Sequence, residues 1–276
     1  MAELLFGTGG VPLSAADRSV EAGVHRIKEL DLDCMEVEFV YGVRIKKEEA
    51  VRAGNLAADL GVALTCHGPY YINLNAAEKE KKEASVKRIL ETARTAQWLR
   101  AGSITFHAGF FLKMDKEEVY GVIREALTRI NATLKEEGVK VRVSPELTGK
   151  ETQFGSLEEL LRLAREVENI HPCVDFAHFH ARTGGAQNSY AEFCETLEKI
   201  ERALGRKALE ELHMHIAGIN YTAKGERNHL NLKESDMEYE ALLKALKDMK
   251  VGGVLICESP NLEEDAKLLK ESYRKL

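Results

Sequence analysis

The sequence of 276 residues lacks the long apolar runs and the basic excess that mark several classes of protein. No segment approaches the roughly 20 apolar residues of a membrane span. The start, MAELLFGTGG, has neither the basic region nor the apolar stretch of a signal peptide. We therefore expect a cytoplasmic protein with no membrane association. The formal net charge of -6 argues mildly against nucleic acid as a partner, although bound metal ions would add positive charge that this count omits.

Cysteine is sparse, and no two cysteines form a C-x-x-C pair. The five cysteines are Cys34, Cys66, Cys173, Cys194 and Cys257. Three of them lie in apolar, strand-like runs, so we expect reduced, buried thiols and neither disulfides nor metal ligands. A phosphate-binding G-x-G-x-x-G is absent as well. Its absence counts against a doubly wound open sheet, which is the structural alternative to a closed barrel.

What the sequence does contain is a regular alternation of short apolar runs with longer amphipathic segments, the pattern of repeated βα units around a parallel sheet. The predicted strands are Leu4–Gly7, Cys34–Phe39, Ala63–His67, Ser103–His107, Lys140–Glu146, His171–Phe176, Leu212–Ile216 and Val254–Glu258. The predicted helices include Glu78–Trp98, Lys116–Lys135, Leu157–Val167, Tyr190–Leu204, Glu238–Met249 and Leu262–Leu269. Eight units and 44% hydrophobic residues predict one (β/α)8 TIM-barrel domain over residues 1–276, which we expect to be monomeric.

From the third predicted strand onward, the last or next-to-last residue of every strand is a potential metal ligand. These residues are His67, His107, Glu146, Asp175 with His178 three positions later, His215 and Glu258. Parallel barrel strands direct their C-terminal ends toward a common axis, so groups distant in sequence can meet there. A mixed set of imidazoles and carboxylates suits zinc, with manganese or iron as alternatives.

Seven candidate ligands exceed what one tetrahedral ion can use, which indicates more than one metal ion. Glu146 could bridge two ions roughly 3.5–4 Å apart, a separation typical of enzymes that hydrolyse phosphoesters. His229, in the segment KGERNHLNL, could supply an eighth ligand.

The remaining histidines are predicted to be structural. His25 lies in a helix, His171 at a strand entrance and His213 two residues before His215. His180 is close to His178, and we expect His178, three residues after Asp175, to be the ligand of the two.

The order of the candidate ligands resembles a known family. The segments CHGPYYINLN, TFHAGF, PELTGKETQFGS, CVDFAH, MHIAGI and CESP, between about residues 60 and 260, resemble the motifs of the endonuclease IV family. The most specific match is H-G-P-Y-Y-I-N-L, which is similar to that family's H-A-P-Y-x-I-N-L. The resemblance implies a TIM barrel, three zinc ions and incision of DNA at apurinic or apyrimidinic sites.

Carried over by position, the resemblance implies three groups of ligands. His67, His107 and Glu146 would hold the first zinc, and Glu146, Asp175, His215 and Glu258 the second. The third would use His178 and His229, together with an aspartate two residues before His229. Arg227 occupies that position here, and Glu226 is the nearest acid. Either Glu226 takes the role, or water completes the shell, or only two ions bind.

Tyr70 and Tyr71 match the aromatic probe that this family inserts into the minor groove, and packing beneath a loop is the equally weighted alternative. Arg44, after the second strand, is a loose match to a basic loop of the family. The substrate implied is double-stranded DNA with an abasic site.

The leading hypothesis is a hydrolase for DNA base-excision repair that cleaves the phosphodiester 5′ to an abasic site. A hydroxide shared between two zinc ions would attack phosphorus, with Glu146 and Glu258 as catalytic carboxylates. The alternative is a sugar isomerase or epimerase of the xylose isomerase-like barrels, in which Glu146, Asp175, His215 and Glu258 hold one ion and carboxylates shuttle a proton. A non-catalytic descendant with a partly lost cluster is a third possibility.

Overall fold

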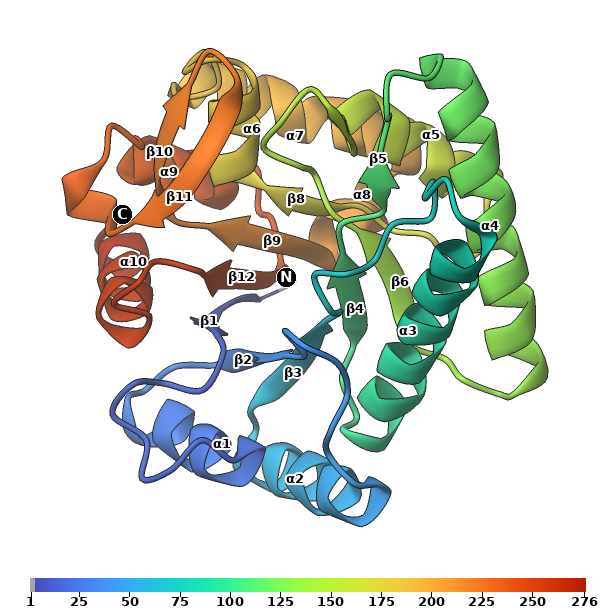
Figure 1. Cartoon of the computed structure of the whole chain (residues 1–276). Coiled ribbons are helices and arrows are strands. Elements are labelled where there is room, and N and C mark those ends of the chain that lie inside the picture. The colour runs from blue at the N-terminus through green and yellow to red at the C-terminus, as the bar shows by residue number, and fades with distance from the viewer. Residues whose placement is uncertain (1–2) are drawn as a thin grey trace.

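A computed structural model describes residues 3–276 as a barrel of eight parallel strands surrounded by helices (Figure 1). The barrel strands are β1 (Leu4–Gly9), β2 (Cys34–Glu38), β3 (Ala63–His67), β4 (Ser103–Phe106), β6 (Arg142–Pro145), β8 (Cys173–Asp175), β9 (Leu212–Ile216) and β12 (Gly253–Cys257). Their order around the sheet is β6-β4-β3-β2-β1-β12-β9-β8. The predicted TIM-barrel fold is confirmed.

Two isolated bridges close the ring between its end strands, β6 and β8. They pair Val143 with Ile170 and Glu146 with Cys173, both in parallel. Closure brings the C-terminal ends of all eight strands to one face of the barrel, where TIM-barrel enzymes carry their active sites.

Helices follow the strands and cover the outside of the barrel (Figure 1). They are α1 (Val20–Glu29), α2 (Lys47–Leu60), α3 (Lys79–Trp98), α4 (Lys116–Glu136), α5 (Leu157–Glu166), α6 (Phe176–Arg182), α7 (Tyr190–Leu204), α8 (Arg206–Glu210), α9 (Tyr239–Asp248) and α10 (Glu263–Lys275), with a 3-10 turn η1 (Leu232–Glu234). Helices α5 and α7 begin at capping boxes, Ser156 with Glu159 and Ser189 with Glu192, which satisfy free backbone N–H groups. No helix within residues 3–276 is long and apolar enough to cross a membrane.

The structure corrects several predicted strand ends. The fourth, fifth and eighth strands stop at Phe106, Pro145 and Cys257, one residue before the predicted ends. The sixth stops at Asp175, and Phe176, predicted as its last residue, begins α6 instead. The cause is local: the Asp175 carboxylate caps α6 by accepting the backbone N–H of His178, with an N–O distance of 2.7 Å.

Two short two-stranded antiparallel sheets, which the sequence did not predict, follow the C-terminal ends of barrel strands. One joins β10 (Gly218–Thr222) to β11 (Gly225–Leu230), and the other pairs β5 (Gly109–Phe110) with β7 (Gln153–Phe154). All five cysteines are free, and four of them are buried, as expected; Cys194 is partly exposed.

Candidate metal centre

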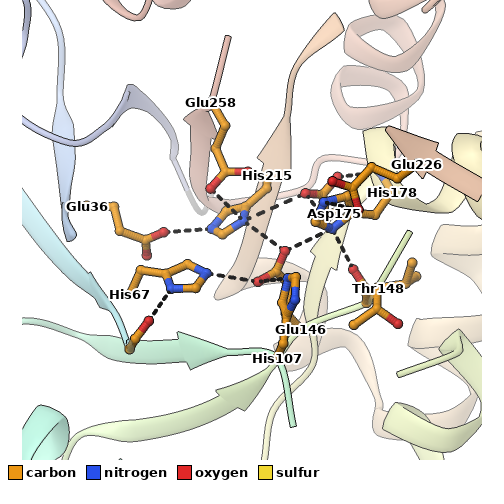
Figure 2. A network of polar contacts seen from close by, with 12 residues as sticks. Glu36, His67, His107, Glu146, Thr148, Asp175, His178, His215, Glu226 and Glu258 are labelled. Atoms are coloured by element: carbon orange, nitrogen blue, oxygen red, sulfur yellow. Dashed lines mark hydrogen bonds and ion pairs between the residues drawn. The ribbon is translucent and has the colours of Figure 1, made fainter. Parts of the chain in front are cut away.

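Six of the eight predicted ligands line a cavity at the C-terminal face of the barrel, and the other two, Asp175 and His215, lie close to Glu146 (Figure 2). The cavity has a volume of about 280 Å³, and its lining residues are His67, Tyr70, His107, Glu146, His178, Glu226, His229 and Glu258. Four of these groups, His67, His107, Glu146 and Glu258, lie at the ends of β3, β4, β6 and β12 or directly after them. The structure therefore brings together side chains that are up to 191 positions apart in the chain, from His67 to Glu258.

Glu146 lies at the centre of the cluster and is 1% exposed. Its Oε2 atom is 3.1 Å from Nε2 of His67 and 3.3 Å from Nε2 of His107. Its Oε1 atom is 3.0 Å from Nδ1 of His178 and 3.6 Å from Nδ1 of His215. Oε2 thus faces the ring nitrogens of His67 and His107, and Oε1 faces Nδ1 of His215, so the two oxygens are placed to serve two different cation sites.

The ligand atoms fall into three overlapping groups, each with all its atoms within 4.8 Å of one another. The groups are His67, His107 and Glu146; then Glu146, Asp175, His215 and Glu258; then Asp175, His178 and His229. Glu146 joins the first group to the second, and Asp175 joins the second to the third.

Backbone carbonyls orient three of the imidazoles. Nδ1 of His67 is 2.7 Å from the carbonyl oxygen of Gly68, and Nδ1 of His229 is 3.2 Å from that of Glu258. Nδ1 of His178 is 3.0 Å from the carbonyl oxygen of Leu147. An Nδ1–H donated to a carbonyl leaves Nε2 unprotonated and free to bind a metal ion, which is a common way to fix the tautomer of a ligand.

The groups of the centre perturb each other's protonation strongly. Burial lowers the pKa of His67, but the carboxylates of Glu38 and Glu146 outweigh that effect and raise the pKa to about 10. Burial raises the pKa of Glu146, but the imidazoles of His107, His178 and His215 hold it well below its usual range. Without metal, protonated imidazoles therefore neutralise the buried carboxylates.

For Asp175, nearby positive charge does not offset the effects of burial and of neighbouring carboxylates on its pKa. Burial raises its pKa, and the charges of Glu258 and Glu146 raise it further, against the opposing effect of His178. Among the described residues, Oδ2 of Asp175, Nδ1 of His215 and Nε2 of His229 are buried without a well-aligned hydrogen bond. Buried polar atoms normally have a partner, so these three atoms fit cations bound by the second and third groups. Nitrogen and carboxylate oxygen donors without thiolates suit zinc, manganese or iron.

Arg227 stands where the resemblance implies an aspartate ligand, and an irregularity in the β10·β11 hairpin compensates for this difference. The β10·β11 register pairs Asn220 with Asn228 but Tyr221 with Glu226, so Arg227 is an extra residue, a β-bulge. Residues three apart in a strand ordinarily face opposite sides, and the bulge allows Glu226 and His229 to line the same cavity. Arg227 is exposed.

The Glu226 carboxylate reaches the centre because residue 149 is a glycine. Oε2 of Glu226 is 3.6 Å from Nε2 of His178. A Cβ atom at Gly149 would lie 2.6 Å from Cβ of Glu226 and 2.8 Å from its Oε2, which is too close for any side chain. The nearest acid to the missing aspartate is thus beside the third group.

The other histidines lie away from the cavity. Nε2 of His180 is 3.1 Å from Oδ1 of Asp236, so of the neighbouring pair His178 is the one at the centre. His25 lies in α1, and His171 lies before β8 at the opposite end of the barrel. His213 is buried inside the barrel, one layer below His215. Cys173 also lies near these two imidazoles, but burial raises the pKa of its thiol to about 12, which keeps it protonated.

Sequence reasoning missed the contribution of β2. Glu36 is fully buried below the centre, and Glu38 forms an acidic group with Glu36 and Glu258. Burial raises the pKa of Glu38 to about 8. The signal was present: in the strand segment MEVEF, two glutamates alternate with apolar residues and so share the inner face.

Of the two tyrosines after β3, Tyr70 lines the cavity, and Tyr71 lies beside Arg88 of α3. Tyr70 is 64% exposed, and its ring is 6.0 Å from that of His67. Tyr71 is 60% exposed, and the Arg88 guanidinium lies 6.0 Å from its ring. Neither is packed beneath a loop, the alternative that the sequence left open.

Two relatives similar in sequence to this chain are an uncharacterized protein and a probable endonuclease. It is 44% identical to an uncharacterized protein of Methanocaldococcus jannaschii over 99% of this chain and 98% of the relative. It is 26% identical to a probable endonuclease 4 of Aster yellows witches'-broom phytoplasma over 66% of this chain and 62% of the relative.

Solved structures share the fold across two enzyme classes. A D-tagatose 3-epimerase-like protein superposes with a TM-score of 0.72 and 20% identity over 93% of this chain and 92% of the other. Endonuclease IV from Thermus thermophilus superposes with a TM-score of 0.70 and 20% identity over 97% of this chain and 98% of the other.

Residues 24–276 match the family described as xylose isomerase-like TIM barrel. The barrel and the match over most of the chain agree with the resemblance to endonuclease IV that the motifs indicate. The chain belongs to the xylose isomerase-like TIM-barrel family, whose members include enzymes as different as endonuclease IV and the sugar epimerases.

Proposed function

We propose that the protein is a metal-dependent phosphodiesterase that incises DNA at abasic sites. The observation that carries the proposal is the shared use of Glu146 and Asp175 by three groups of ligand atoms. An isomerase that binds one ion needs only Glu146, Asp175, His215 and Glu258. His67, His107, His178 and His229 then have no ligand role, although their free nitrogens and their placement around the cavity suit one.

The residues have separable tasks in this hydrolysis. Metal ions bound here would supply a nucleophile at neutral pH and neutralise charge on the phosphate. Glu146 faces both of the first two groups and holds them in a fixed relation. Glu258 reaches the cavity with a side chain that is 15% exposed, so it is placed to orient the attacking water and accept its proton. Glu226 takes the place of the missing aspartate in the third group.

The surface on either side of the cavity suits a polyanion. A groove of about 740 Å³ shares Glu226 with the cavity and is lined by Lys150, Lys224 and Arg227. A second, of about 360 Å³, includes Arg18 and Arg44. Basic side chains in such positions would contact phosphates on both sides of the scissile bond, despite the net negative charge of the whole chain.

Exposed aromatic side chains add a second element of recognition. Tyr70 lines the cavity, its chain neighbour Tyr71 is exposed, and Tyr41, which lines the second groove, is 70% exposed. In the proposal, Tyr70 contacts the abasic nucleotide, and Tyr71 enters the minor groove, where an aromatic wedge supports a bend. Displacing a nucleotide from the stack costs least where its base is already missing.

A duplex with one tetrahydrofuran abasic analogue tests the proposal. The protein is incubated with this duplex, with an undamaged duplex of the same sequence, and with chelator or added zinc. The expected result is incision on the 5′ side of the analogue that chelator abolishes and zinc restores, with the undamaged duplex intact. The absence of metal-dependent incision at a large excess of protein would refute it.

A second candidate function is sugar isomerisation or epimerisation. The observation in its favour is that Glu146, Asp175, His215 and Glu258 form a complete group by themselves. In that reaction the carboxylates of Glu146 and Glu258 would exchange a proton with the sugar carbon. Release of deuterium from labelled ketoses, with no incision of the abasic duplex, would favour this candidate.

A further inference from the structure

Directly below the metal centre, the barrel interior contains a carboxylate that the proposed chemistry does not use. Glu36 of β2 is 0% exposed. Its Oε1 atom is 2.8 Å from Nε2 of His215 (Figure 2). The other ring nitrogen of His215, Nδ1, faces the metal groups and lies 3.5 Å from Oε1 of Glu258 and 3.6 Å from Oε1 of Glu146. Glu36 therefore contacts the side of the imidazole that points away from the centre.

His215 differs from three of the other candidate imidazoles, those of His67, His178 and His229, in how it is oriented. Nδ1 of His67, His178 and His229 each lies near a backbone carbonyl oxygen. Within the described residues, Nε2 of His215 has no such carbonyl, and the Glu36 carboxylate occupies that place. The oxygen lies within hydrogen-bond distance of Nε2, although the N–H is not ideally aligned with it.

Three further side chains fix Glu36 in turn. The hydroxyl of Thr65, its register partner on β3, donates to Oε2 at 2.7 Å. Nε2 of His213 lies 3.0 Å from the same oxygen. The Ser103 hydroxyl lies 3.0 Å from Nδ1 of His213. Residues from β2, β3, β4 and β9 thus form one polar layer across the barrel.

Such a layer is costly where branched apolar side chains ordinarily fill a barrel. Burial of a charged pair gains little net stability, and apolar replacements are often at least as stable. Glu36 adds little to stability, and it contacts His215 on the side of the ring that faces away from the metal groups. Its presence is therefore better explained by an effect on the orientation of His215.

We propose that Glu36 is a positioning residue of the metal centre, which holds His215 with its proton on Nε2 and Nδ1 free for a metal ion. His213, Thr65 and Ser103 hold Glu36 in place. Carboxylates behind ligand imidazoles act in this way, and their loss weakens metal binding about 10- to 100-fold. The inference rests on the metal centre of the proposed function but is independent of its substrate.

Titration of the metal-free full chain with zinc, in competition with a chromophoric chelator, tests the inference. Glu36→Leu and Glu36→Gln both remove the charge and keep the size of the side chain, but only glutamine retains an oxygen that can accept the Nε2–H of His215. We expect Glu36→Leu to weaken one zinc equivalent about 10- to 100-fold and Glu36→Gln to stay within about threefold of wild type. A role in packing alone predicts equal affinities in the two variants.

Asn131→Leu is the control for loss of a buried polar side chain far from the centre, since Asn131 of α4 donates to the Glu168 carbonyl oxygen. We expect wild-type zinc affinity there. If Glu36→Leu does not fold, Thr65→Val removes the hydroxyl that holds Glu36, and we expect a several-fold loss. The inference would be overturned if Glu36→Leu, or Thr65→Val in its place, bound zinc with wild-type affinity. It would also be overturned if Glu36→Leu and Glu36→Gln lost affinity equally. Normal zinc behaviour without incision would refute only the substrate, whereas a wild-type chain that binds no zinc would refute both.

Discussion

The candidate ligands on the barrel strands and those of the third group are held in different ways. His67, Asp175 and His215 lie on strands β3, β8 and β9 of the closed sheet, and His107, Glu146 and Glu258 directly follow strands. His178 lies on the short helix α6, and Glu226 and His229 lie on the inserted β10·β11 hairpin.

This difference separates a rigid part of the centre from an adaptable part. Strand ends are fixed by ladders on both sides, so a ligand there cannot move without disturbing the barrel. A hairpin can accept an extra residue as a bulge and still present two side chains to one face. The resemblance implies an Asp-x-His pair of ligands, and this chain has Glu226 and His229 instead. Both residues lie in the adaptable part.

The strongest test of the rigid part is Glu146→Gln. The amide cannot bridge two cations, and it leaves the imidazoles of the first two groups without their shared charge. We expect incision of the abasic duplex to fall at least about 10³-fold and bound metal to fall below wild type. Glu166→Gln, on the outer surface of α5, is the matched control and should behave as wild type. Residual incision within tenfold of wild type would remove Glu146 from its central role.

The adaptable part should be separable from the rigid one. Glu226→Gln and His229→Ala are expected to lose one metal equivalent and about 10- to 100-fold in incision rate, while the first two groups remain loaded. Elemental analysis of the dialysed variants gives the count. Loss of all metal from either variant would show that the two parts do not load independently.

Protonation gives a test of how the metal-free centre is held together. The pKa of His67 is raised to about 10, and those of His178 and His215 are also raised well above 6.5. Groups with raised pKa values stabilise the fold fully below their unfolded pKa, and this contribution is lost as pH rises through the folded value. The free energy of unfolding in chelator should therefore fall from pH 7 to 10. Glu146, with its lowered pKa, contributes a constant amount over this range.

Urea unfolding at several pH values, with and without zinc, measures this effect. Metal ligation replaces the protons on the imidazoles, so zinc should remove most of the decline. A metal-free stability that is flat or rises between pH 7 and 10 would contradict the assigned charges.

The smallest effect is expected at the bulge itself. Arg227 is exposed beside the basic groove, so Arg227→Gln should leave the metal count unchanged. If its guanidinium contacts a phosphate, the salt dependence of DNA binding should become shallower by about one unit of slope. Lys199→Gln, on α7 and paired with Glu195, is the surface control. Binding measured at several salt concentrations distinguishes the two variants.

The sequence predicted the rigid part because barrel topology relates each strand end to the same axis. Six ligand positions followed from strand order alone, and the structure places all six within the first two groups. The barrel and its main helices followed from the alternation of apolar runs, with errors of one or two residues at several strand ends.

Other features depend on contacts that no local pattern specifies. The bulge that turns Glu226 inward arises from pairing across the β10·β11 hairpin and from the space at Gly149. Glu36 lies inside its strand, away from the strand end where ligands were sought, and its role is visible only through His215 and His213. Polar residues that act through another side chain are identified by geometry.

The number of metal ions per chain distinguishes a polynuclear centre from a mononuclear one. Elemental analysis of the purified, dialysed protein, alongside Glu146→Gln, gives this number without any assumption about substrate. The account predicts two or three ions per wild-type chain and fewer in the variant. One ion per chain, unaffected by loss of His67 or His107, would contradict it and favour a mononuclear isomerase centre.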